Sequence, residues 1–135
     1  MGTNDGRQRI VAASMSLLTI GAGLWIRSGS VPPTLAKPIG VALWSALVFW
    51  LLVLLRPRSS IWIVVVVASC LGVAVEILQR TPFPAWMASQ IPASRWVLGR
   101  HFHASDLPWY PMGALGAGVL DLAQRRLRTR RPRGA

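Results

Sequence analysis

Acidic side chains are scarce in this chain, which has four Asp or Glu residues against 15 Lys or Arg residues in a total of 135. A soluble nucleic-acid-binding domain would spread its positive charge over a folded surface, whereas here the charge lies between apolar blocks and at the chain ends. The single cysteine, Cys70, excludes an internal disulfide, and its place inside an apolar run indicates an inert, buried thiol. Because 53% of the residues are hydrophobic, the composition indicates an integral membrane protein and not a nucleic-acid binder.

Apolar sequence is abundant, and it falls into four blocks of about 17 residues each. At a rise of about 1.5 Å per residue, a helix of this length just crosses the hydrocarbon core of a bilayer. In lipid, a segment of this length satisfies its own backbone as a helix. We therefore predict an all-α polytopic membrane protein, a bundle of four transmembrane helices. Residues 1–124 form a single membrane domain and 125–135 a basic cytoplasmic tail. The predicted spans are Ile10–Ile26, Ile39–Leu55, Ile61–Leu78 and Leu107–Ala123.

The distribution of basic residues predicts the orientation. Ten of the fifteen lie at the N-terminus, in the loop Arg56–Ser60 and in the tail. The positive-inside rule then places both termini in the cytoplasm and Gln79–Asp106 outside, in the inner membrane of a bacterium. The first block has an alternative interpretation as a cleaved signal peptide, which its length disfavours.

Two segments outside the blocks also carry signals. The stretch "RTPFPAWMASQIPASRW" contains three prolines and alternates apolar with polar residues, which is typical of an interfacial or re-entrant segment. The tail from residue 125 carries six arginines. Because it directly follows a span, we expect it to rest on anionic lipid head groups rather than to bind RNA or DNA.

The third block carries a stripe of small residues that ends in an acid. Glu76 and Gln79 are three residues apart and share a helix face, and Gly72 and Ala68 lie one and two turns further along it. Small residues at this spacing allow another helix to approach closely. Glu76 is therefore expected to point into the bundle, where a carboxylate needs a partner.

A matching stripe follows in the fourth block. Asp106 takes an N-cap position, and Tyr110, Gly113, Ala117 and Asp121 continue the same face. Packing the two stripes together predicts a contact of the third span with the fourth through their glycines, and an outward-facing polar pocket above it. The predicted members of the pocket are Glu76, Gln79, Asp106 and Tyr110, with Arg95 and Arg100 as countercharges.

Two histidines raise the question of a metal. His101 and His103 could act as ligands together with Asp106 and Glu76, but an H-x-H pair is a weak signal and needs a strand-like loop to aim both rings at one point. We therefore expect neither a metal nor a cofactor.

The same residues resemble a family of small bacterial four-helix membrane proteins, the domain-of-unknown-function family 2809. Its pattern is E-x-x-Q, an Arg-containing loop, and L-G-x-x-F-x-x-x-D-L-x-x-Y-x-x-G, preceded by an arginine after the first span, prolines and G-x-x-L-W. Val41 departs from the pattern, because the family often has Asp there, and this puts a mechanism that uses a carboxylate at that position in doubt. The matching positions are Arg27, Pro32, Gly40, Leu43, Trp44, Glu76, Gln79, Arg95, Leu98, Gly99, Phe102, Asp106, Leu107, Tyr110 and Gly113.

This family is similar in turn to the VanZ-like proteins, which show E-x-x-Q, then R, then D-x-x-x-N-x-x-G. Tyr110 stands here in the position of their Asn. VanZ-like proteins are linked to glycopeptide resistance at the cell envelope. The resemblance therefore implies an envelope role and no defined reaction.

Two functions compete. In the first, the pocket binds or processes a lipid or a lipid-linked cell-wall intermediate, with an ionisable acceptor and its partner, countercharges for an anionic head group, and polar side chains that orient it. In the second, the chain is a non-enzymatic accessory protein whose polar cluster locks the helices together. A third, a homo-oligomeric transporter component, also fits short spans that carry acids. In the first hypothesis, Glu76 is the ionisable acceptor and Asp106 is its partner. Arg95 and Arg100 would hold the anionic head group, and Gln79 and Tyr110 would orient it.

Overall fold

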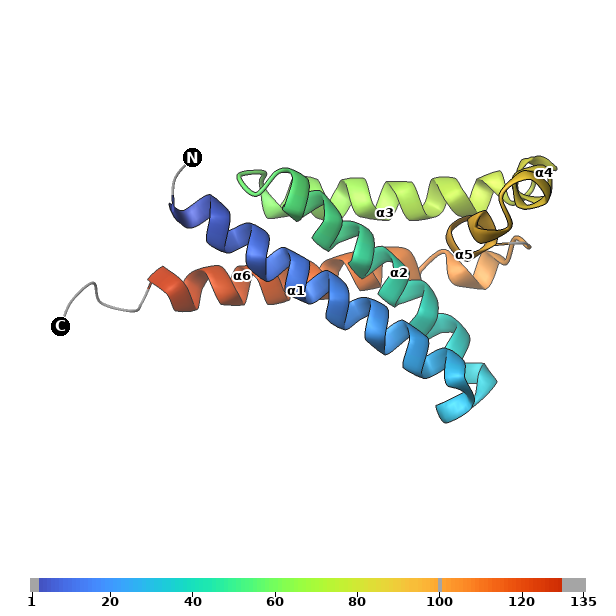
Figure 1. Cartoon of the computed structure of the whole chain (residues 1–135), viewed down its shortest axis with the longest axis horizontal. Coiled ribbons are helices and arrows are strands. Elements are labelled where there is room, and N and C mark those ends of the chain that lie inside the picture. Colours follow the sequence, from blue (N-terminus) through green and yellow to red (C-terminus); the bar gives the residue numbers. More distant parts are fainter. Residues whose placement is uncertain (1–2, 100, 130–135) are drawn as a thin grey trace.

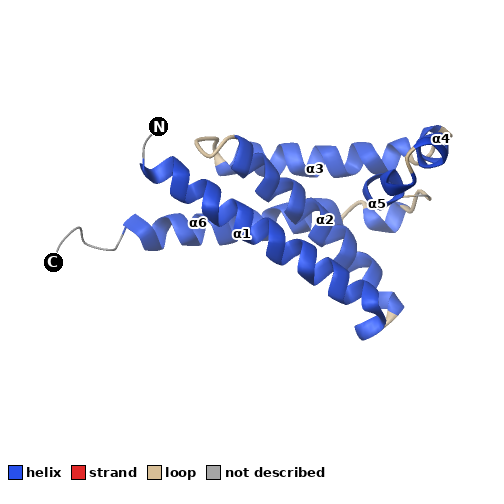
Figure 2. Ribbon diagram, viewed as in Figure 1, coloured by secondary structure: helices blue, strands red, loops and turns tan. Residues whose placement is uncertain are grey.

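The computed structural model describes residues 3–99 and 101–129, and its regular elements are helices (Figure 2). The all-α prediction is confirmed, with 85% of the described residues helical. Four helices are long, two are short, and three further turns of helix connect them. In chain order the elements are α1 (Thr3–Trp25), η1 (Ile26–Ser30), α2 (Pro33–Leu55), α3 (Ile61–Leu78), α4 (Phe83–Gln90), η2 (Pro92–Ser94), α5 (Arg95–Leu98), η3 (Ala104–Asp106) and α6 (Trp109–Thr129).

The four long helices alternate in direction along the molecule. Helices α1 and α2 form one pair that crosses α3 and α6 at an angle (Figure 1). Helix α6 packs against both α2 and α3, and α1 packs against α2. The start of α1, the α2–α3 loop and the end of α6 therefore share one end of the molecule, whereas α4 and α5 lie at the other end (Figure 1). We call the first the terminal end and the second the α4–α5 end.

Glycine and proline set the turn between α1 and α2. Gly29 has φ of 90°, in the left-handed region that glycine enters without a steric cost. Pro33 begins α2 as its first residue, where the missing N–H has no partner to lose. The helix therefore begins six residues before the predicted start at Ile39.

Three helices are long and apolar enough to cross a membrane: the stretch from Asp5 to Ser30, α2 and α3. Helix α3 has the predicted bounds. Helix α6 has 21 residues, but its second half carries Asp121 and several arginines, so it does not reach the same apolarity. It starts at Trp109, two residues after the predicted start at Leu107, and ends at Thr129, six residues after the predicted end at Ala123.

The core is narrow and the outer surface is apolar. Small side chains and two aromatic rings fill the space between the helices, while many large apolar side chains face outward, such as Leu17 at 70% and Ile63 at 62% exposure. Such a belt is an aggregation hazard in water but suits contact with lipid. Cys70 belongs to this outer surface, so the prediction of a buried thiol is wrong; α3 buries only one stripe of its circumference. That stripe is Val64, Val65, Ala68, Gly72 and Glu76.

Candidate functional site

Glu76 is the centre of a polar cluster at the α4–α5 end. It lies in the last turn of α3 and is 1% exposed. Its Oε1 accepts the backbone N–H of His103 at 2.5 Å, and its Oε2 accepts the hydroxyl of Tyr110 at 2.8 Å. Hydrogen bonds to an ionised acceptor are stronger than neutral ones. The cluster therefore holds this carboxylate by one donor on each oxygen.

Gly72 makes room for the ring that reaches Glu76. A Cβ on Gly72 would lie 2.2 Å from Cδ1 of Tyr110, so any side chain there would displace the ring. Tyr110 is 5% exposed, and Trp44 of α2 packs edge-on against it at 6.0 Å between ring centroids. Ala68, one turn further along α3, is fully buried in the core. The small-residue stripe of α3 thus faces α6, as its spacing predicts.

Gly113 faces a different neighbour. The nearest atoms to a Cβ placed on Gly113 are the carbonyl oxygen, carbonyl carbon and Cα of Ala42, at 2.0, 2.6 and 2.8 Å. The predicted contact of Gly113 with the third span is therefore wrong, because α6 lies between two helices and this face belongs to α2. The contact of α6 with α3 is made instead by Gly118 against Val65, a position that the sequence reasoning missed, while Ala117 is 2% exposed in the core.

Asp106 is the second buried acid of the cluster. It ends the turn η3, three residues before α6 begins, and is 7% exposed. Its Oδ2 lies 3.3 Å from Nζ of Lys37, and its Oδ1 accepts the hydroxyl of Ser105 at 3.3 Å. Among the described residues no backbone amide of α6 donates to it, so the predicted N-cap role is not what this carboxylate does.

Lys37 is the member of the cluster that the sequence did not predict. It lies in the first turns of α2, before the apolar run Ile39–Leu55 that defined the predicted span. A usable signal was present, since Lys37 is the only lysine of the chain and stands two residues before the second apolar block.

Arg95 does not take the predicted place beside Asp106. Its Nε donates to the carbonyl of Pro92 at 2.9 Å, and the side chain is exposed. Arg100, the other predicted countercharge, lies outside the described residues. Two further arginines at this end rest on aromatic rings, each 4.3 Å from the ring centroid: Arg27 on Trp96 and Arg80 on Phe102.

Gln79 holds the connecting segment. Its Nε2 donates to the carbonyl of Leu98 at 2.7 Å, while its buried Oε1 has no hydrogen-bond partner within the described part of the chain. Gly99 follows with φ of 68°, and a Cβ there would lie 2.5 Å from Nε2 of Gln79. Both the backbone angle and the close approach therefore require glycine at this position.

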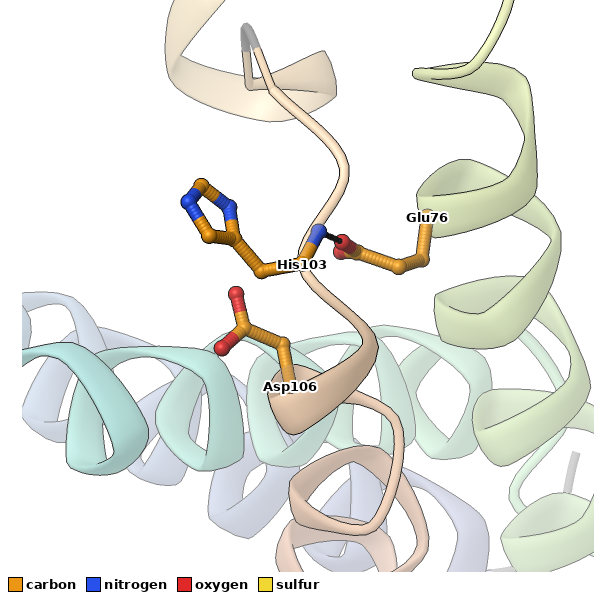
Figure 3. A group of neighbouring side chains, drawn as sticks. All are labelled: Glu76, His103 and Asp106. Carbon is orange, nitrogen blue, oxygen red and sulfur yellow. Dashed lines mark hydrogen bonds between the residues drawn. The ribbon is translucent and has the colours of Figure 1, made fainter.

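His103 brings an imidazole to the two carboxylates. One ligand atom each from Glu76, His103 and Asp106 lies within 4.8 Å of the others, and Figure 3 shows the Asp106 carboxylate beneath the His103 ring. Nδ1 of His103 lies 3.0 Å from the carbonyl of His101, whose own ring belongs to neither carboxylate's set of contacts. A metal site with both imidazole rings, as considered from the sequence, does not form here. Only the ring of His103 lies near the carboxylates, and His101 contributes its backbone carbonyl.

An apolar groove lies beside this cluster. It has a volume of about 400 Å³ and is lined by α1, α2 and α6. Its end nearest the cluster is marked by Ile39, two residues after Lys37, and by Trp109, three residues after Asp106. Further lining residues are Met15, Trp50, Gly116 and Leu120.

The terminal end has its own buried acid, Asp121, which is fully buried and completely paired. Its Oδ1 accepts Nε2 of Gln8 at 2.6 Å, and its Oδ2 lies 3.0 and 2.9 Å from Nε and Nη2 of Arg125. Arg128 then donates to Oε1 of Gln8 at 2.7 Å, and Arg125 reaches the carbonyl of Pro57 at 3.4 Å. This network joins α1, α6 and the α2–α3 loop.

Comparison with known proteins gives a family and no activity. No curated protein and no solved structure matches the sequence. The match to a family covers α2 through the first turn and a half of α6, and so contains both carboxylates of the cluster, Lys37 and Tyr110, but neither α1 nor Asp121. Over residues 31–114 this chain belongs to the family described as Protein of unknown function (DUF2809).

Proposed function

We propose that this chain is a four-span membrane protein that holds a lipid or a lipid-linked envelope molecule, with the apolar chain in the groove and the head group beside Lys37. The observation that carries the proposal is the position of the groove. The lining of the apolar groove between α1, α2 and α6 includes Ile39 and Trp109, which follow the ion-paired Lys37 and Asp106 by two and three residues in the chain. An amphipathic ligand needs this combination of surfaces side by side.

The membrane arrangement follows from packing and charge. Helix α6 packs along α2 and α3, which supports its role as the fourth span. Its Asp121 is neutralised by Arg125 near the terminal end, where most basic residues of the described part of the chain also lie. The positive-inside rule then directs the terminal end to the cytoplasm of a bacterial cell and the α4–α5 end outward.

The segment before α6 fits an interfacial position. It forms α4, η2 and α5, and large apolar side chains such as Trp86 and Trp96 are more than half exposed there. Indole rings prefer the boundary between head groups and acyl chains. The VanZ-like resemblance supports an envelope role for a pocket at this end.

The groove has the dimensions of a ligand site. Its volume of about 400 Å³ falls in the range of about 300–1,000 Å³ that is typical of small-molecule sites. Gly116 lines it, and a Cβ there would meet nothing within 4 Å. A side chain at position 116 would therefore extend from α6 into the groove without meeting another atom.

The head group would meet cations as well as acids. The Lys37 side chain is 44% exposed, so its ammonium can contact a ligand while it remains near Asp106. Arg27 lies in η1, before α2, and rests on the ring of Trp96 in α5 at the same end. These cations favour an anionic head group such as a phosphate.

The competing role is that of an accessory protein with a structural lock. The observation in its favour is that each oxygen of Glu76 already accepts a hydrogen bond from the chain itself. Glu76→Gln separates the two roles, because it keeps the shape and removes the charge. A lock residue would lose stability in this variant, whereas a site residue would lose ligand or phenotype in a protein that stays folded.

The direct test fills the groove. Gly116→Leu places a side chain in the open space, and Gly21→Leu is the matched control, because Gly21 is exposed on α1, has nothing within 4 Å of its Cβ and does not line the groove. Lipid that co-purifies with each variant is quantified by mass spectrometry. We expect several-fold less bound lipid for Gly116→Leu and no change for Gly21→Leu. Equal lipid content in both variants contradicts the proposal.

A further inference from the structure

We propose that Glu76, His103 and Asp106 form a binding site for a divalent transition-metal ion of the Zn²⁺ or Mn²⁺ class. The three side chains come from α3 and from the segment before α6, and one ligand atom of each lies within 4.8 Å of the others (Figure 3). Metal–ligand bonds of about 2.0–2.2 Å require the atoms to approach by about 1 Å more. His103 is exposed and can make that movement without disturbing the core. This inference stands on the cluster alone and does not depend on lipid binding in the groove.

The ligand set selects the kind of ion. Ca²⁺ and Mg²⁺ prefer sites made of oxygen ligands, so the imidazole nitrogen of this set disfavours them. The set also lacks the thiolates that are typical of a structural zinc site. Mixed oxygen and nitrogen ligands suit Zn²⁺, Mn²⁺ and Fe²⁺. Three protein ligands leave positions free for water or for a further oxygen ligand.

Charge gives the cluster a reason to take a cation. Glu76 and Asp106 are 1% and 7% exposed, and a buried carboxylate needs compensation. Within 3–99 and 101–129, Lys37 is the cation that pairs with either of them, and it contacts only Asp106. Glu76 is held by the neutral donors of His103 and Tyr110. A divalent ion between the carboxylates would supply the missing positive charge.

The surroundings already orient the ligands. Nδ1 of His103 lies 3.0 Å from the carbonyl of His101, so the tautomer with its proton on Nδ1 leaves Nε2 with a free lone pair. The Tyr110 hydroxyl holds one oxygen of Glu76 in position. Partners of this kind, behind the ligands themselves, commonly fix the orientation of metal-binding His and carboxylate groups.

Lys37 would compete with the ion. Its ammonium lies 3.3 Å from Oδ2 of Asp106, close enough to repel a divalent cation at that carboxylate. At 44% exposure the lysine side chain can move to solvent when an ion binds. Removal of Lys37 should therefore strengthen metal binding, whereas in a purely structural ion pair the same change has no reason to create affinity for a metal.

The test uses the full chain in detergent, with any histidine tag removed. Binding of Zn²⁺ and Mn²⁺ is measured by equilibrium dialysis and calorimetry for the parent and for His103→Ala, Asp106→Asn and Lys37→Met. We expect one ion per chain, a loss of at least tenfold in affinity for His103→Ala and Asp106→Asn, and a gain for Lys37→Met. His103→Ala changes an exposed residue, so it remains informative if Asp106→Asn fails to fold.

Two controls address other donors. His101→Ala keeps the backbone carbonyl that orients His103 and should leave affinity unchanged. Cys70→Ser removes the exposed thiol and should do the same. Absence of stoichiometric binding overturns the proposal. So does binding that survives His103→Ala, or binding that weakens in Lys37→Met.

Discussion

The contact of α6 with α2 through Gly113 yields the sharpest structural prediction. In Gly113→Ala, the new methyl group would lie 2.0 Å from the carbonyl oxygen of Ala42 and 2.6 Å from its carbonyl carbon. Both are backbone atoms of a long helix and cannot rotate away as a side chain can. The two helices must therefore separate locally, and a contact that packs the second turn of α6 against α2 is lost.

The magnitude follows from two opposing terms. Overpacking a close contact costs about 1–3 kcal/mol. On the same helix, Gly116→Ala meets nothing within 4 Å and should gain about 0.4–1 kcal/mol from lower backbone entropy in the unfolded chain. The same gain applies to Gly113→Ala, so the two alanine variants should differ by the overpacking cost alone, about 1–3 kcal/mol in the free energy of unfolding, although the chemical change is identical.

Unfolding in mixed detergent, followed by tryptophan fluorescence, measures this difference. The two substitutions lie three residues apart on one helix, so differences in helix propensity and in membrane insertion cancel. If Gly113→Ala is as stable as Gly116→Ala, the packing of α6 on α2 is wrong. That result would favour the contact of Gly113 with the third span, which the sequence predicts.

Three further outcomes are expected from the same protein. Gly72→Ala should lower the free energy of unfolding by about 1 kcal/mol, less than Gly113→Ala does, because its new methyl group meets the ring of Tyr110 and not backbone. The ring can shift at the expense of its hydrogen bond to Glu76. In a Tyr110→Phe background, Gly72→Ala should therefore cost less stability. Asp121→Asn should cost about 1–3 kcal/mol in detergent unfolding, because it leaves part of a buried network unpaired, whereas Asp5→Asn, whose partner is 76% exposed, should cost less than about 1 kcal/mol. Ser89→Cys in α4 should react with an impermeant thiol reagent from outside intact cells, and labelling from the cytoplasmic side alone contradicts the proposed orientation.

Much of the fold could be predicted because its signals are local. Long apolar runs specify helices by their length, and the bounds of α3 were predicted to the residue. The starts of α2 and α6 were less accessible. Pro33 begins α2 well before its apolar run, and Trp109 begins α6 after a turn that proline and aspartate made ambiguous. At both places the boundary depends on how a turn closes, which hydropathy does not report.

The sequence predicts the two acids of the candidate site, Glu76 and Asp106, but not its cation, Lys37. The spacing of Gly72 and Glu76 requires a neighbouring helix, so the meeting of Glu76 with Tyr110 followed from the sequence. Lys37 did not follow, since it reaches Asp106 across 69 positions of the chain and depends on how α2 crosses α6. The angle at which α2 crosses α6 is set by contacts such as that of Gly113 with α2. The periodicity of a single sequence predicts which face of a helix is buried, but not which helix packs against that face.

The buried acids at the two ends of the molecule have different partners, and this difference supports the proposed site at the α4–α5 end. Asp121 has an arginine on one oxygen and an amide on the other, and the arginine is itself tied to a neighbouring loop. Nothing in that network is left to bind a ligand, so it is a structural lock. At the α4–α5 end, the exposed Lys37 pairs with Asp106 and, within the described residues, no cation pairs with Glu76, while an exposed imidazole lies beside both acids. The fold pairs the buried Asp121 with an arginine at one end, so it has no structural need to leave Glu76 without a cation at the other. Burying an unpaired carboxylate costs stability, and a ligand that binds Glu76 and Asp106 explains why the chain keeps them.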